Sequence, residues 1–132
     1  MVLTPLDRHG AFNNQLAKRV LENPEAQEKL IEEILANIRE KGMLGVDFDF
    51  EYVFKENRDQ YTQLVRKARE RLNEEGYLVT VALAPKTSTD QQGLLYQGHD
   101  YEGMGKAANL VLLMTYEWGY TLPQQCSKLV CF

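Results

Sequence analysis

The chain has no long hydrophobic run and no excess of positive charge, and these absences exclude several classes of protein. Its longest apolar stretch, around residues 109–114, is much shorter than the roughly 20 residues that a membrane-spanning helix needs. The N-terminus has no basic segment followed by an apolar one, so we expect no export signal. The net charge of -4 provides no basic surface for nucleic acid or for an anionic membrane. We therefore expect neither nucleic acid nor a membrane as a partner.

Cysteine and histidine are also scarce. The two cysteines, Cys126 and Cys131, have no histidine or further cysteine at the spacing of a metal site, so we interpret them as incidental. The two histidines, His9 and His99, are isolated, and an isolated histidine is more often a packing or loop residue than a catalyst. We expect no metal and no cofactor. The 132 residues, 44% hydrophobic and 26% charged, suit one globular domain.

What the sequence does contain is a row of alternating acids. Residues 45–52 read Gly-Val-Asp-Phe-Asp-Phe-Glu-Tyr. On a strand, Asp47, Asp49 and Glu51 would share one face, with successive carboxyls about 6.5–7 Å apart. Such crowding raises the pKa of at least one carboxyl group, and an acid that is still protonated near neutral pH can act as a general acid. The row is therefore a candidate catalytic site.

Helix and strand patterns surround this row. A helix is predicted between Asn23, as N-cap, and Gly42, and a second one between Asn57, with Gln60 completing a capping box, and Gly76. The second helix has an apolar stripe at helical spacing, namely Tyr61, Leu64, Val65, Ala68 and Leu72. One or two short helical turns are expected within 86–105. Strands are predicted at 44–51, 77–83 and 110–116. This alternation indicates parallel strands joined by right-handed crossovers.

Two α/β architectures use such units, an open doubly wound sheet and a closed barrel. In the open sheet, three carboxyls on one face would be buried beneath helices at a severe desolvation cost. In the barrel, the inward face opens into a cavity at the carboxyl ends of the strands, where Glu51 would lie and where barrel enzymes perform their chemistry. We therefore predict a partial (β/α)8 TIM barrel with parallel strands and outer helices. A full barrel has roughly 250 residues, so the chain would hold three strands and part of a fourth.

The acidic row has two other interpretations. It could be an edge strand of an antiparallel sheet with one solvated polar face, but the flanking helices disfavour this. It could also bind a divalent metal through carboxylate oxygens. No glycine-rich phosphate loop accompanies the acids, which disfavours that site.

A second motif, residues 114–118 (Met-Thr-Tyr-Glu-Trp), lies at the end of the last predicted strand. With the Asp-x-Asp-x-Glu run at 47–51, it resembles glycoside hydrolase family 18, the chitinase-like barrels, and in particular the bacterial branch that includes spore cortex peptidoglycan N-acetylglucosaminidases. Segments 50–52, 82–87, 91–96 and 99–101 resemble that branch in order and spacing. We interpret residues 1–120 as an incomplete catalytic domain of this family and residues 121–132 as an atypical tail.

The resemblance implies hydrolysis of β-1,4 bonds in polymers that contain N-acetylglucosamine, peptidoglycan or chitin, by substrate-assisted retaining catalysis. Glu51 would be the general acid and base. Asp49 would hold the N–H of the 2-acetamido group, whose carbonyl oxygen is the nucleophile, and Tyr116 would hydrogen-bond that carbonyl. Further residues would bind the sugar: Asp47, Met114, Glu117 and Trp118.

The chain departs from the family pattern at Leu44, where many members carry another aspartate. The family suggests a location at the spore or cell wall, and the absent strands would have to come from elsewhere. The alternative is a non-catalytic carbohydrate-binding barrel or an inactive truncated one. Substitution of Glu51 separates the two, because only an enzyme has turnover to lose.

Overall fold

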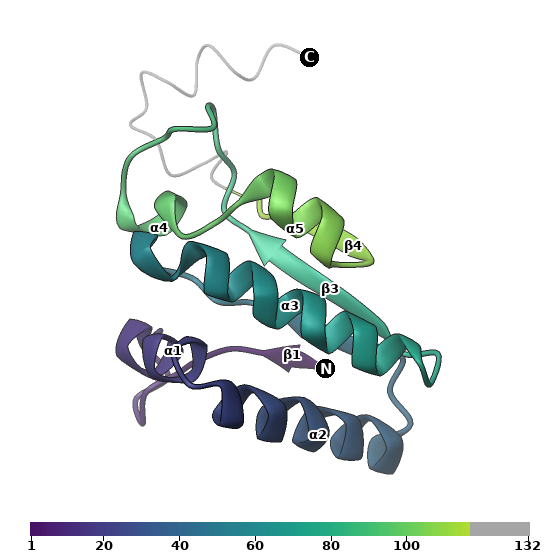
Figure 1. The fold of residues 1–132 in the computed structure, drawn as a ribbon. Coiled ribbons are helices and arrows are strands. Elements are labelled where there is room, and N and C mark those ends of the chain that lie inside the picture. Colours follow the sequence, from purple (N-terminus) through teal and green to yellow (C-terminus); the bar gives the residue numbers. More distant parts are fainter. Residues whose placement is uncertain (117–132) are drawn as a thin grey trace.

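The computed structural model describes residues 1–116, which form one parallel sheet covered by helices (Figure 1). The sheet has four strands in the order β1-β2-β3-β4: β1 (Val2–Leu3), β2 (Gly45–Phe48), β3 (Leu78–Leu83) and β4 (Leu110–Leu113). The helices are α1 (Asn14–Leu21), α2 (Pro24–Lys41), the 3-10 turn η1 (Lys55–Asn57), α3 (Arg58–Asn73), α4 (Leu94–Gln97) and α5 (Tyr101–Ala107). Within this part of the chain, no helix has the length and apolarity needed to cross a membrane.

The arrangement of the layers confirms the predicted architecture. All three strand pairs are parallel, and each strand lies beside the next one along the chain. Helices α2, α3 and α5 lie side by side on the same side of the sheet (Figure 1). A parallel sheet that advances in one direction with its helices on a single face is the arrangement of a (β/α) barrel. The described residues therefore form a partial barrel.

Helix α2 begins and ends as its sequence predicts. The side chain of Asn23 accepts a hydrogen bond of 3.1 Å from the N–H of Ala26, and Pro24 occupies the first helical position. Gly42 follows the helix in the left-handed conformation with φ 61°, which costs glycine little. Both ends are therefore fixed by local sequence.

The start of α3 differs from the predicted capping box. The Nδ2 atom of Asn57 donates to Glu22 at 3.0 Å and to Gln60 at 2.7 Å, and its side chain caps no N–H. The turn η1 leads into the helix instead. Asn57 is buried and ties the end of α1 to α3, so its role is tertiary and the prediction of a local cap was wrong.

Helix α1 was not predicted, although its signal is present. The side chain of Asn13 accepts from the N–H of Leu16 at 2.9 Å, and Ala17 and Leu21 are buried four residues apart. An N-cap followed by apolar residues at this spacing is the usual sign of a short amphipathic helix. The segment was missed because eight residues give a weak periodic signal.

The core lies between the sheet and the two long helices. The predicted stripe of α3 is confirmed, since all five of its apolar residues are buried; they pack with strand residues that include Val46, Phe48, Val79 and Val81. In contrast, all four residues of β4 are exposed, and 63% of the surface of Leu110 is accessible. The strands of the described sheet therefore differ in burial: β2 and β3 pack against the helices, whereas β4 is an exposed apolar strand at the edge of the sheet.

Gly45 gives a test of the packing between β2 and β3. A Cβ atom at this position would lie 1.9 Å from the carbonyl oxygen of Leu78 in the neighbouring strand. Because a backbone atom cannot move aside as a side chain can, we expect Gly45→Ala to lower the free energy of unfolding by about 3 kcal/mol. Urea denaturation measures this change.

The matched control is Gly105→Ala in α5, where an added Cβ would meet no atom within 4 Å. Alanine at an open helical position should stabilise the chain by about 0.5–1 kcal/mol. Equal effects of the two substitutions would contradict the close approach of β2 and β3.

Candidate active site

The acidic run lies at the carboxyl end of β2, but the strand is shorter than predicted. It ends at Phe48, so Asp47 belongs to the strand while Asp49 and Glu51 follow it. After Phe48 the backbone is held by side chains: the N–H of Phe50 lies 3.4 Å from the hydroxyl of Tyr61, and its carbonyl lies 2.9 Å from Nε2 of His99. These contacts replace the ladder bonds that would have continued the strand.

Asp47 is half-buried on the sheet. Its register partners are Val2 on β1 and Thr80 on β3, and the Thr80 hydroxyl donates a hydrogen bond to its Oδ1 atom. This bond to a neighbouring strand fixes the side chain in place. Asp47 therefore contributes a carboxyl group in a fixed position, two residues before Asp49.

Asp49 has the most distinctive surroundings of the three acids. Its N–H donates to the carbonyl of Leu3 at 3.0 Å, and its Oδ2 atom accepts from the Thr4 hydroxyl at 3.4 Å. Its Oδ1 atom is buried and has no hydrogen-bond partner among the described residues. Burial raises the pKa of Asp49 above its usual value, the charge of Asp47 adds to this rise, and the Thr4 hydroxyl opposes it. A buried carboxyl oxygen without a donor is costly, so it is a site where a ligand N–H would be favourable.

Glu51 is half-buried and is followed by a residue in an unusual conformation. Tyr52 has φ 56°, which is rare for a residue other than glycine, and its ring packs against Phe12 with the ring centres 5.8 Å apart. Such strain is frequent at functional sites, where the surrounding structure maintains it. The chain therefore makes a sharp change of direction directly after Glu51.

The structure describes only the first three residues of the second motif, 114–116. The N–H of Met114 donates to the carbonyl of Leu83 at 3.0 Å, which fixes the residue beside the end of β3. Tyr116 follows β4, two strands from β2, and 66% of its surface is exposed. The three acids thus follow one another at the carboxyl end of β2, whereas Tyr116 follows β4. Glu117, Trp118 and the predicted tail at 121–132 lie outside the described residues.

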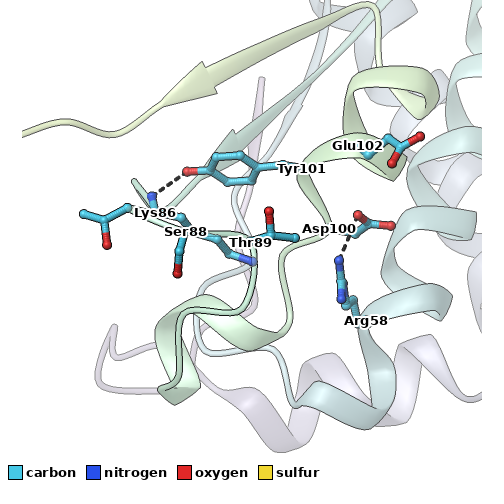
Figure 2. A pocket seen from close by; sticks show the side chains of 8 residues that line it. Arg58, Lys86, Ser88, Thr89, Asp100, Tyr101 and Glu102 are labelled. Atoms are coloured by element: carbon cyan, nitrogen blue, oxygen red, sulfur yellow. Dashed lines mark hydrogen bonds and ion pairs between the residues drawn. The ribbon is translucent and has the colours of Figure 1, made fainter.

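Sequence reasoning missed a cavity of about 360 Å³ beside the end of β3 (Figure 2). Arg58 and Asp100 form an ion pair of 2.9 Å in its wall. The Nζ atom of Lys86 donates to the carbonyl of His99, and burial lowers the pKa of the amine. The remaining lining residues are Thr87, Ser88, Thr89, Tyr101 and Glu102. In the sequence, only the position of Thr87, Ser88 and Thr89 after a strand end could have indicated part of this lining.

The metal interpretation gains no support from the geometry. Within residues 1–116, no group of three or more histidine, cysteine, aspartate or glutamate side chains comes together in a way that could hold a metal ion. Asp47 belongs to β2 and is bound to Thr80, whereas Asp49 and Glu51 follow the strand.

Comparisons with known proteins agree with the fold described above. The chain is 41% identical to the cortical fragment-lytic enzyme of Bacillus subtilis (strain 168) over 121 residues. The aligned part covers 92% of this chain and 28% of that protein. The crystal structure of the spore cortex-lytic enzyme SleL of Bacillus megaterium QM B1551 superposes with a TM-score of 0.86 at 38% identity, covering 92% of this chain and 28% of that one. A chitinase of Chromobacterium violaceum ATCC 12472 shares the fold, with a TM-score of 0.81 at 20% identity over 92% of this chain and 37% of that one.

The chain thus spans somewhat more than a quarter of the length of the cortex-lytic relatives. The sequence model of glycosyl hydrolases family 18 matches residues 11–125, which include both motifs and nearly all of the described sheet. With its helix-covered parallel sheet and the acids at the end of β2, the chain belongs to glycosyl hydrolases family 18.

Proposed function

We propose that this chain is part of a glycosidase that cleaves β-1,4 bonds in polymers containing N-acetylglucosamine by substrate-assisted retaining catalysis. The observation that carries the proposal is that the Oδ1 atom of Asp49 is buried and has no hydrogen-bond donor among the described residues. Asp49 precedes Glu51 by two residues in the sequence. A 2-acetamido group has the N–H that this oxygen lacks. Its carbonyl oxygen would then be turned toward the anomeric carbon as the nucleophile.

The other residues would have the following roles. Glu51 would protonate the leaving glycosidic oxygen and later deprotonate the attacking water. Asp47, fixed by Thr80, would lie deeper in the site and share charge and a proton with Asp49. Tyr116 would donate to the acetamido carbonyl after moving or turning inward from its exposed position. Met114, Glu117 and Trp118 would contact the sugar.

The substrate is proposed to be the polymer of the spore cortex, a peptidoglycan, with chitin as the second candidate. The relatives named for cortex lysis are 36–41% identical to this chain, whereas the Chromobacterium chitinase is 20% identical. This difference favours peptidoglycan and, with it, a location at the spore or cell wall. The division into residues 1–120 as catalytic domain and 121–132 as tail stays a prediction.

Strand β4 supports a role for further barrel strands. Its four residues are exposed and apolar, and 48% of the surface of Leu112 is accessible. In a closed barrel a neighbouring strand covers such residues. We therefore expect additional strands from elsewhere to complete the active enzyme.

A thiazoline derivative of N-acetylglucosamine, which mimics the oxazolinium ion, tests the proposed function. Because it mimics the cyclised acetamido group, it should bind where Asp49 and Glu51 are assembled. At a concentration about one hundred times its Kd it should stabilise the folded chain by about 2.7 kcal/mol. Calorimetric unfolding with and without the compound measures this effect, with glucose as the control sugar.

A chain that unfolds cooperatively, yet at the same temperature in either sugar, would contradict the proposed site. The alternative of a non-catalytic carbohydrate-binding chain predicts stabilisation by the thiazoline and no turnover of any polymer. Hydrolysis assays on the same preparation separate these two outcomes.

A further inference from the structure

His99 is buried between two strand ends and has no role in the steps proposed above. Its Nδ1 atom accepts a hydrogen bond of 3.1 Å from the N–H of Ala84, at the end of β3. Its Nε2 atom lies 2.9 Å from the carbonyl oxygen of Phe50, directly before Glu51. A backbone N–H can only donate and a carbonyl can only accept, so the ring is neutral and carries its proton on Nε2. Burial lowers the pKa of His99, which agrees with a neutral ring.

The segment that carries His99 is firmly attached to β3. The hydroxyl of Tyr101 donates to the carbonyl of Ala84 at 2.6 Å and accepts from the N–H of Lys86 at 2.7 Å (Figure 2). The Nζ atom of Lys86 donates in turn to the carbonyl of His99. These bonds join the segment that carries His99 to the residues that directly follow β3. His99 is therefore a rigid support and not a mobile loop residue.

The segment that His99 supports is one that the sheet does not hold. Residues 50–53 have left β2, and Tyr52 within them has a strained φ of 56°. Gly98 contacts the far end of this segment, since a Cβ atom there would lie 2.2 Å from the carbonyl oxygen of Val53. His99 holds the near end through Phe50. Gly98 and His99 together thus hold both ends of the segment that contains Glu51.

We propose that His99 is a positioning residue for Glu51: by binding the carbonyl of Phe50 it fixes the direction in which the chain presents the catalytic carboxyl group. This inference rests on the proposed role of Glu51. Tyr61 assists it, because its hydroxyl lies 3.4 Å from both the N–H of Phe50 and the carbonyl of Phe48. A displacement of the catalytic carboxyl by a fraction of a bond length is enough to slow an enzyme.

Two substitutions separate positioning from simple packing. In His99→Gln, the amide nitrogen can replace Nε2 and donate to Phe50. In His99→Asn, the amide oxygen can replace Nδ1 and accept from Ala84, but no donor reaches Phe50. Packing alone predicts similar defects in both variants, since each leaves one polar group of the backbone unpaired in the same buried place.

Hydrogen exchange of the backbone amides, followed by NMR on the 132-residue chain, gives a readout that does not depend on turnover. In His99→Asn we expect the amides of residues 50–53 to exchange about ten times faster while those of β3 keep their rates. In His99→Gln the rates of 50–53 should remain near the wild-type values. A uniform rise over the whole chain in either variant, or unchanged rates at 50–53 in His99→Asn, would overturn the proposal.

Binding of the same thiazoline compound completes the test. Affinity should fall about tenfold in His99→Asn and be largely restored in His99→Gln. Leu35→Ala, a core change in α2 at a fully buried residue, should lower stability without changing the exchange pattern at 50–53. If the wild-type chain does not bind the compound at all, the proposed function fails, and the exchange pattern still decides whether His99 holds the segment.

Discussion

Glu51→Gln is expected to lower hydrolysis of an N-acetylglucosamine oligomer by about a thousandfold while leaving sugar binding almost unchanged. Glutamine has the size of glutamate and keeps an oxygen acceptor, but it cannot give a proton to the leaving oxygen or take one from water. The backbone around it is held by Tyr61 and His99, so the substitution should not disturb the segment. Release of a fluorescent aglycone from a chitobioside measures turnover, and calorimetry measures binding.

The control for this experiment is Glu25→Gln, which removes an exposed carboxylate in the first turn of α2, away from the end of β2. It should leave turnover unchanged. A Glu51→Gln chain that keeps more than about a tenth of the wild-type rate would show that another group supplies the proton. A wild-type chain that binds sugar but never releases the aglycone would favour the non-catalytic alternative.

Asp49→Asn should change activity and stability in opposite directions. The carboxylate that would hold the acetamido N–H is lost, so kcat/KM should fall about a hundredfold. Stability at neutral pH should rise by a few degrees in Tm, because burial makes the ionised form of Asp49 unfavourable and asparagine carries no charge. Thermal unfolding followed by circular dichroism, together with the hydrolysis assay, measures both effects.

The pH dependence of this gain has a definite sign. The pKa of Asp49 is higher in the folded chain than the unfolded value of 3.8. The folded state therefore holds the proton more tightly, and the stability that this contributes is full below pH 3.8 and is lost as the pH rises through the folded pKa. The advantage of Asp49→Asn should thus be large at pH 7 and vanish toward pH 3.8.

Asp90→Asn, at an exposed position, should show no such pH-dependent gain and serves as the control. If Asp49→Asn lowered the melting temperature at pH 7, the burial of an uncompensated carboxyl would be contradicted. If it kept full activity, Asp49 would have no part in holding the substrate.

Local sequence was sufficient to locate the two long helices and the strands that they cover, but not the cap of α3 or the end of β2. The N-cap at Asn23 and the glycine at 42 act within one helical turn, so the bounds of α2 could be predicted. The apolar stripe of α3 is buried as its spacing indicates, because one face of a helix must meet the sheet. The two family motifs were also visible without coordinates. The short helix α1 and the cavity beside Lys86 were not.

What the sequence by itself determined is therefore the alternation of helices and strands, the family motifs and the position of the acids at the end of β2. Only the tertiary structure decided where that strand stops, because the groups that take over the backbone of Phe50 lie 11 and 49 residues away, in Tyr61 and His99. The same holds for Asp49: burial in the folded chain raises its pKa, the charge of Asp47 adds to this rise, and the hydroxyl of Thr4, 45 residues away, opposes it. Periodicity reports which face of an element is buried, but hydrogen bonds between distant segments determine how a catalytic group is held.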